Sequence, residues 1–137
     1  YGLETVTFRY FNVFGERSPS RGQYAPVISI FQRQAEAGDA LTIVGDGSQR
    51  RDFVHVRDVA RANYMAATTP TLEHVFNVGS GKNYSVQEIA SAISDNQVYL
   101  PERPGEATVT LADISKIGKF IGWKPEIDVM DWIYEQR

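Results

Sequence analysis

The sequence predicts the α/β class, because short apolar runs typical of strands alternate along the chain with segments of helical periodicity. The first run, Thr5–Val13, is rich in β-branched and aromatic residues. Its apolar residues occupy both odd and even positions, as in a parallel strand that is covered on both faces. The 137 residues suffice for one domain with one core.

A loop and an amphipathic helix are predicted after this strand. Gly15–Tyr24 contains Gly, Pro, Ser and charged residues, a composition typical of a loop. The next apolar residues recur at helical spacing, and Gly38 is placed to end the helix. The apolar stripe of this helix consists of Val27, Ile30, Phe31 and Ala35.

Two strands and a second helix are predicted in the middle of the chain. Leu41–Val44 is a short strand that ends at a Gly-Asp-Gly turn, and Phe53–Val56 is another apolar run. Asp58 is expected to cap the following helix. The buried face of that helix is predicted to be Val59, Ala62 and Ala66.

The next strand is Val75–Val78, and a capping box of Ser85 and Glu88 marks the start of a third helix. A short strand, Val98–Leu100, is predicted before Pro101. The apolar stripe of the third helix is Val86, Ile89, Ala90 and Ile93.

Two short helices are predicted at the end of the chain. Asp113 is expected to cap one that carries Ile114, Ile117 and Ile121 and stops at Gly122, and Asp128 begins the other. The last helix is predicted to turn Val129, Trp132 and Ile133 inward.

The composition argues against several classes of partner. A net charge of −3 provides no electrostatic case for nucleic acid or an anionic membrane, and no apolar run approaches the roughly 20 residues of a membrane span. There is no cysteine, and His55 and His74 lack ligand-like spacing, so no metal site is predicted. The absence of cysteine fits a reducing compartment, and we expect a cytoplasmic protein.

Three stretches could carry binding chemistry. Asn12 falls where the first strand ends, and strand ends face the ligand crevice of an open α/β sheet, although an amide there could equally tie down the loop. One guanidinium of the pair Arg50-Arg51 could capture a phosphate, or both could be solvated. Arg103 and Glu106 flank a Pro-Gly turn and could read a nucleotide, or belong to an ordinary polar loop.

The stretch NVGSGKNYS lacks the spacing of a phosphate loop and is interpreted as a strand-to-helix connection. We find no catalytic triad, no paired acid and base carboxylates and therefore no catalytic residue in this chain.

Four longer motifs, taken together, resemble the NAD-dependent epimerase/dehydratase family of extended short-chain dehydrogenases/reductases, and within it the enzymes of the UDP-glucose 4-epimerase type. They are RYFNVFGERSPSRGQYAPVISIF, LTIVGDGSQRRDFVHVRDVARAN, FNVGSGKNYSVQEIA and PERPGEATVTLADISKIGKFIGWKPE. The resemblance implies the C-terminal portion of a Rossmann-type enzyme, with a small mixed α/β substrate-binding domain. Residues 1–14 would supply a strand of the Rossmann sheet and residues 15–137 the nucleotide-sugar-binding region, with the N-terminal NAD-binding domain absent.

The resemblance also implies roles for individual residues. Asn12, Arg51 and Arg103 would hold the diphosphate of a UDP-sugar, and Glu106 would take the ribose hydroxyls. The residues expected to line the uridine are Pro26, Val27, Thr42 and Val44, and those expected near the nicotinamide of NAD are Tyr10 and Phe11. Many relatives have Pro where this chain has Ser29.

The function implied is UDP-hexose binding within an NAD-dependent 4-epimerase, with this chain inactive by itself. Two alternatives stay open: a stand-alone nucleotide-binding or interaction module, and part of a dehydratase or decarboxylase on the same scaffold. The residues do not identify the sugar. An exposed apolar edge at Thr5–Val13 would recruit another chain, so a homo-oligomer is expected.

Overall fold

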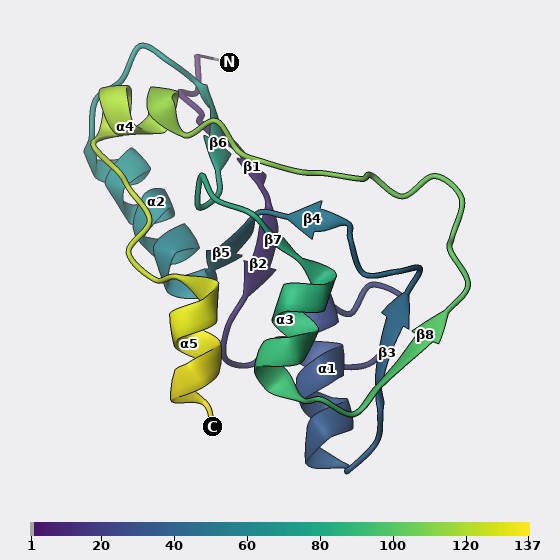
Figure 1. Cartoon of the computed structure of the whole chain (residues 1–137). Coiled ribbons are helices and arrows are strands. Elements are labelled where there is room, and N and C mark those ends of the chain that lie inside the picture. Colours follow the sequence, from purple (N-terminus) through teal and green to yellow (C-terminus); the bar gives the residue numbers. More distant parts are fainter. Residues whose placement is uncertain (1) are drawn as a thin grey trace.

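The computed structural model describes residues 2–137 and has mixed α/β structure, as predicted; Tyr1 lies outside the described residues (Figure 1). The strands are β1 (Thr7–Tyr10), β2 (Asn12–Phe14), β3 (Leu41–Val44), β4 (Arg50–Arg51), β5 (Phe53–His55), β6 (Val75–Val78), β7 (Tyr84–Ser85) and β8 (Gln97–Leu100). The helices are α1 (Val27–Glu36), α2 (Val56–Thr68), α3 (Val86–Ile93), α4 (Ser115–Ile121) and α5 (Val129–Glu135).

The strands form two-stranded pairs. β1 pairs with β6, β2 with β5 and β3 with β8, all parallel, whereas β4 and β7 are antiparallel. The predicted strand Thr5–Val13 is split at Phe11, whose amide donates to Val78, while the amide of Asn12 donates to Asp52. The chain thus passes from one partner strand to another. Most of β1 is exposed, in agreement with the exposed edge expected at Thr5–Val13 in this chain.

Two apolar cores replace the single core that was predicted. One lies among α1, α3, α5 and β3, and the other among α2, α4 and β6. Successive side chains of a strand point to opposite faces. In β5, therefore, Phe53 belongs to the first core and Val54 to the second. This strand joins the two halves of the molecule.

Several predicted helix boundaries are confirmed. The capping box of Ser85 and Glu88 is present, Gly38 follows the end of α1 with φ of 75°, and Asp128 caps α5 through the amides of Met130 and Asp131. The strand predicted over Val98–Leu100 is β8.

The predicted cap at Asp58 is wrong. The α2 helix begins at Val56, and the ring of His55 accepts a hydrogen bond from the amide of Arg57. Asp58 is fully buried, and its carboxylate accepts from the amides of Glu126 and Ile127. A carboxylate in the first turn of a helix can instead accept hydrogen bonds from a segment that is distant in the sequence. A local sequence pattern does not reveal such a contact.

The α4 helix also begins later than predicted. Ile114 is its N-cap residue, and Asp113 lies one position before it, where its carboxylate accepts from the amide of Ser115.

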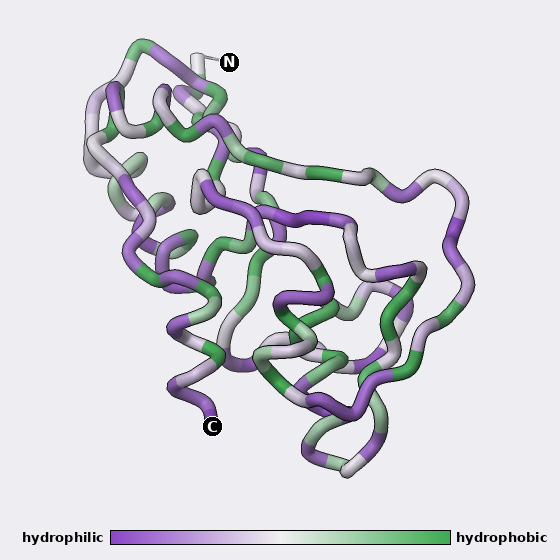
Figure 2. Tube along the Cα trace, in the orientation of Figure 1, coloured by the Kyte–Doolittle hydropathy of each residue, from purple (hydrophilic) through white to green (hydrophobic). Residues whose placement is uncertain are grey.

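A long extended segment, residues 101–114, runs from β8 back across the molecule to α4 (Figure 1). Hydrophilic and hydrophobic residues alternate along part of it (Figure 2). It is attached along β4, where the amide of Arg50 donates to Thr108 and the amide of Thr110 donates to Arg50. The buried carboxylate of Asp52 accepts from the amide of Ala112 at 3.0 Å. We call residues 101–114 the arm.

Gly79 provides a test of this attachment. A Cβ atom there would lie 2.5 Å from the Cβ of Ala112 and 3.1 Å from the Asp52 carboxylate. We expect Gly79→Ala to lower the free energy of unfolding by roughly 1–3 kcal/mol, as overpacking does. Gly118→Ala is the matched control, because a Cβ there meets only the Trp123 carbonyl at 3.7 Å and alanine favours helix. Urea denaturation measures both, and an unchanged or higher midpoint for Gly79→Ala would contradict the packing.

Candidate functional site

A cavity of about 580 Å³ opens where β2 and β3 approach the start of α1. Its walls come from five separate parts of the chain. These are Phe11 with β2, the segment Tyr24–Phe31, the region from β3 to Phe53, Val86 at the start of α3, and the arm with the end of β8.

Most of the predicted site residues border this one cavity. All eight residues predicted for the substrate, and Phe11, contribute to its wall, although they are up to 95 positions apart (residues 11 and 106). The eight are Asn12, Pro26, Val27, Thr42, Val44, Arg51, Arg103 and Glu106. Tyr10 is not part of the wall; its hydroxyl accepts a hydrogen bond from Asn63 of α2 at 2.8 Å.

The neighbouring arginines Arg50 and Arg51 have different surroundings. Arg50 donates to the side chain and carbonyl of Asn83 and pairs with Glu88 at 3.3 Å. Arg51 borders the cavity, and its guanidinium donates to the carbonyl of Arg50. Within residues 2–137 Arg51, Arg103 and Glu106 form no ion pair. The cavity therefore has two cations that a bound anion could pair with.

The strand β3 offers backbone groups to the cavity. The amides of Leu41 and Gly45 donate to the carbonyls of Asn96 and Leu100. The peptide groups of the odd-numbered residues of β3 therefore point toward β8. In a parallel pair both peptide groups of a residue face the same neighbour. The amides and carbonyls of Thr42 and Val44 therefore face away from β8.

Two glutamines at this edge were not predicted from the sequence. Gln49 borders the cavity and donates to the carbonyl of Val44 at 3.0 Å, and Gln34 of α1 bonds Thr42. Gln49 could have been found, because alternation along a strand places it on the same face as Arg51. No pattern in the sequence pairs Gln34 with Thr42.

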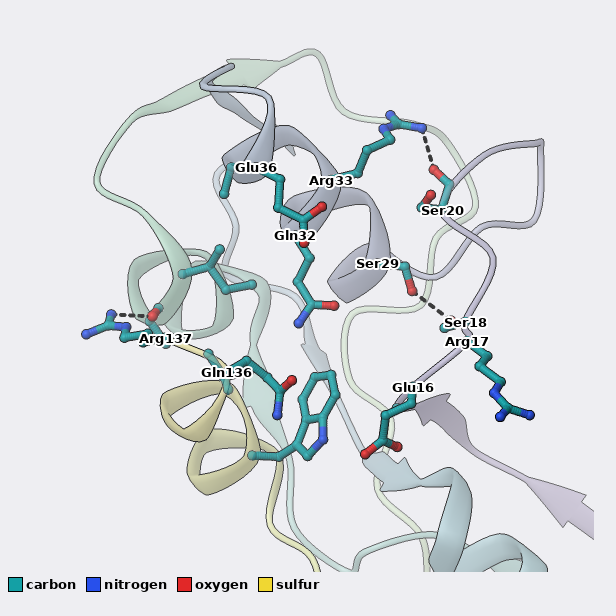
Figure 3. Close-up of a pocket in the computed structure, with 16 residues that line it drawn as sticks. Glu16, Arg17, Ser18, Ser20, Ser29, Gln32, Arg33, Glu36, Gln136 and Arg137 are labelled. Carbon is teal, nitrogen blue, oxygen red and sulfur yellow. Dashed lines mark hydrogen bonds between the residues drawn. The ribbon is translucent and has the colours of Figure 1, made fainter.

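A second cavity, of about 550 Å³, lies between the outer face of α1 and the ends of α3 and α5 (Figure 3). Glu16 and Arg17 border it from the loop after β2, and Gln136 and Arg137 from the end of α5. None of the predicted site residues lies in its wall.

Glu16 joins the loop after β2 to the start of α2. One carboxylate oxygen lies 3.3 Å from Nε2 of His55 and the other 3.2 Å from the guanidinium of Arg57. Nδ1 of His55 accepts from the amide of Arg57, so in the neutral ring the proton is on Nε2, facing Glu16. Burial lowers the pKa of His55 below its ordinary value of 6.5. The negative charges of Glu16 and Asp58 raise this pKa but do not outweigh the effect of burial.

Among residues 2–137, no cluster of three or more His, Asp or Glu side chains suited to a metal is present. The described helices include none with the length and apolar character needed to cross a membrane.

Comparison with known proteins gives consistent matches. The model of the NAD dependent epimerase/dehydratase family matches residues 1–79. A Methanocaldococcus jannaschii protein named "Putative UDP-glucose 4-epimerase" is 41% identical over 97% of this chain and 44% of its own length. A UDP-N-acetyl-alpha-D-glucosaminuronate decarboxylase of Bacillus cytotoxicus is 40% identical over 67% of this chain and 28% of its own length.

Solved structures match over nearly the whole chain. The UDP-glucose 4-epimerase of Thermotoga maritima with UDP-glucose has a TM-score of 0.90 and 33% identity, covering 98% of this chain and 45% of that one. A UDP-N-acetylglucosamine 4-epimerase from Methanobrevibacter ruminantium, in complex with UDP-N-acetylmuramic acid, has a TM-score of 0.90, 39% identity and the same coverage. The Thermus thermophilus UDP-glucose 4-epimerase complex with NAD gives 0.84 and 31%, again with 98% and 45% coverage. The chain thus spans less than half the length of these relatives.

His55 makes stability depend on pH. Below about pH 6.5 the unfolded chain takes up a proton on this histidine that the folded chain takes up only at lower pH, so acidification favours unfolding. We expect the urea midpoint to fall between about pH 7.5 and about pH 5.5, and to fall less in His55→Asn, which keeps a side chain suited to an N-cap.

The matched control is His74→Asn. His74 is exposed, so this substitution should leave the pH dependence as it is in the unaltered chain. An equal fall in the His55→Asn and unaltered chains would show that other groups cause the dependence.

Proposed function

This chain belongs to the NAD dependent epimerase/dehydratase family, and we propose on that premise that it is the nucleotide-sugar-binding part of a UDP-hexose 4-epimerase. The single observation that carries the proposal is the gathering of nine residues, expected to meet a UDP-sugar or NAD, around one cavity. These residues come from four segments that are distant in the sequence, and two of them are arginines without ion-pair partners in residues 2–137.

The diphosphate is assigned to Arg51 and Arg103. A guanidinium binds phosphate oxygens through two parallel N–H donors, and hydrogen bonds to charged groups are stronger than neutral ones. Asn12, at the start of β2 beside the same cavity, adds an amide donor. Because Arg51 has no carboxylate partner within residues 2–137, binding requires no ion pair of this arginine to be broken there.

The nucleoside is assigned to the opposite wall. Pro26 and Val27 offer apolar surface at the start of α1, and β3 offers the outward peptide groups of Thr42 and Val44. Glu106 on the arm can accept hydrogen bonds from the two ribose hydroxyls.

NAD would supply the hydride acceptor of the reaction when bound. Phe11 borders the cavity and can lie against a flat ring, whereas Tyr10 is half-exposed outside it. Of the two residues expected near the nicotinamide, only Phe11 borders the cavity. We therefore assign NAD binding and catalysis to other parts of a whole family member, in which residues 1–14 would join the Rossmann sheet, and assign positioning of the substrate to residues 15–137.

A nucleotide-binding cavity of this kind is compatible with a second reaction on UDP-sugars. The 40% identity to a UDP-N-acetyl-alpha-D-glucosaminuronate decarboxylase favours that reaction as a second candidate. Both candidates require the same nucleotide cavity, so they differ in the sugar and in residues outside it. A cytoplasmic, homo-oligomeric protein is part of the first proposal and is supported by the lack of cysteine and the exposed strand β1.

UDP binding tests the proposal directly. We expect Arg51→Ala and Arg103→Ala each to weaken the binding of UDP to this chain by roughly 1.5–3 kcal/mol, the range for hydrogen bonds to charged groups. Arg50→Ala should weaken it much less, because Arg50 bonds Asn83 and Glu88 instead. Isothermal titration calorimetry measures the affinities, with circular dichroism as a check that each variant is folded.

A larger loss for Arg50→Ala than for Arg51→Ala would contradict the assignment of the phosphate. Failure of UDP to bind the unaltered chain would contradict the proposed function itself.

A further inference from the structure

The side chain of Gln34 makes two hydrogen bonds to one residue of the cavity wall. Helix α1 packs alongside β3 (Figure 1). From α1, Nε2 of Gln34 donates to Oγ1 of Thr42 at 2.9 Å, and Oε1 accepts from the amide of Thr42 at 3.1 Å. Both residues are half-buried.

These two bonds fix which way the amide group lies. A backbone amide can only donate, so the atom of Gln34 that faces it must be the oxygen. The nitrogen then faces Oγ1 of Thr42 and donates to it. Because a lone pair of Oγ1 is taken in this way, the hydroxyl hydrogen of Thr42 must point elsewhere. No acceptor for it occurs among the described residues, and Thr42 borders the cavity.

The backbone around Thr42 completes a pattern of polar groups. The carbonyl of Thr42 and the amide of Val44 face away from β8, whereas the carbonyl of Val44 already accepts from Gln49. The edge of β3 thus presents a hydroxyl donor, a carbonyl acceptor and an amide donor in succession.

We propose that Gln34 is a specificity-determining residue that holds the Thr42 hydroxyl as a donor and so selects a base with an imide edge. The inference rests on the proposed function, since it concerns the base of the same nucleotide. Uracil offers a carbonyl, an N–H and a carbonyl along this edge, which complement donor, acceptor and donor when the Thr42 hydroxyl donates to the carbonyl at position 4 and the Val44 amide to the carbonyl at position 2. Cytosine carries an amino group and an unprotonated nitrogen at two of these positions, so it would leave groups of β3 without partners.

Gln34 acts through Thr42 and is a positioning residue. A merely structural role, tying α1 to β3, would change the affinity for every nucleotide alike. A role in selecting the base changes the ratio of the affinities for UDP and CDP.

The test measures the binding of UDP and CDP to this chain by calorimetry. The unaltered chain should bind UDP roughly tenfold more tightly than CDP. Thr42→Val removes the hydroxyl but keeps the branched shape, and it should weaken UDP binding by roughly five- to tenfold while changing CDP binding by less than about twofold. Thr42→Ser is the control that should keep the preference, because it keeps the hydroxyl.

Gln34→Glu provides the sharper comparison. A carboxylate can only accept, so the Thr42 hydroxyl would donate to it and present a lone pair to the cavity. The UDP preference should then fall at least about tenfold and approach or pass equality with CDP. Gln34→Met, of similar length but without a hydrogen-bonding amide, should give an intermediate ratio.

The outcomes separate the two proposals. Equal binding of UDP and CDP by the unaltered chain, or a ratio unchanged in both Gln34→Glu and Thr42→Val, would overturn this inference and leave the proposed function standing. No binding of either nucleotide would overturn both.

Discussion

The buried carboxylate of Asp52 is the contact on which the arrangement of the cavity depends. It accepts hydrogen bonds from the amide and hydroxyl of Ser80, from the amide of Gly81 and from the amide of Ala112, at 2.6–3.0 Å. Its own carbonyl accepts from the amide of Asn12. A buried charge is tolerated only when its lone pairs are satisfied, and here the donors to the carboxylate come from two distant segments, at Ser80-Gly81 and at Ala112. Asp52 also directly follows Arg51, so the contacts that fix one residue fix the other.

The two arginines of the cavity can bind an anion because the surrounding residues do not engage them in ion pairs within residues 2–137. Along β4, the side chain of Arg50 turns to Asn83 and Glu88, and Arg51 takes the opposite face. Arg103 reaches the same cavity from the arm, whose far end is anchored at Asp52. Neither arginine has an ion-pair partner within residues 2–137, and the strand and arm that carry them are held by hydrogen bonds, which is the arrangement expected of a binding site whose geometry is set before the ligand arrives.

Local signals in the sequence predicted what local interactions decide. The capping box at Ser85, the cap at Asp128 and the residues of β3 depend on neighbours in the chain, and they agree with the structure. The site residues, by contrast, followed from a family resemblance. Three features depend instead on contacts between distant parts of the chain. Thr5–Val13 pairs with two different strands, Asp58 accepts hydrogen bonds from residues near the C-terminus, and Gln34 bonds Thr42. Such contacts leave no periodicity or cap signal, and for that reason the pattern of the sequence did not predict them.

Hydrogen exchange and UDP binding of Asp52→Asn test most directly whether this carboxylate organises the cavity. An asparagine has nearly the same shape but loses an acceptor and adds donors among four existing donors. We expect faster exchange of the amides of Ser80, Gly81 and Ala112, together with weaker UDP binding, although Asp52 does not border the cavity. The exposed Asp39→Asn should change neither measurement. If Asp52→Asn retained both the protection of these amides and the affinity for UDP, the dependence of the cavity on Asp52 would be contradicted.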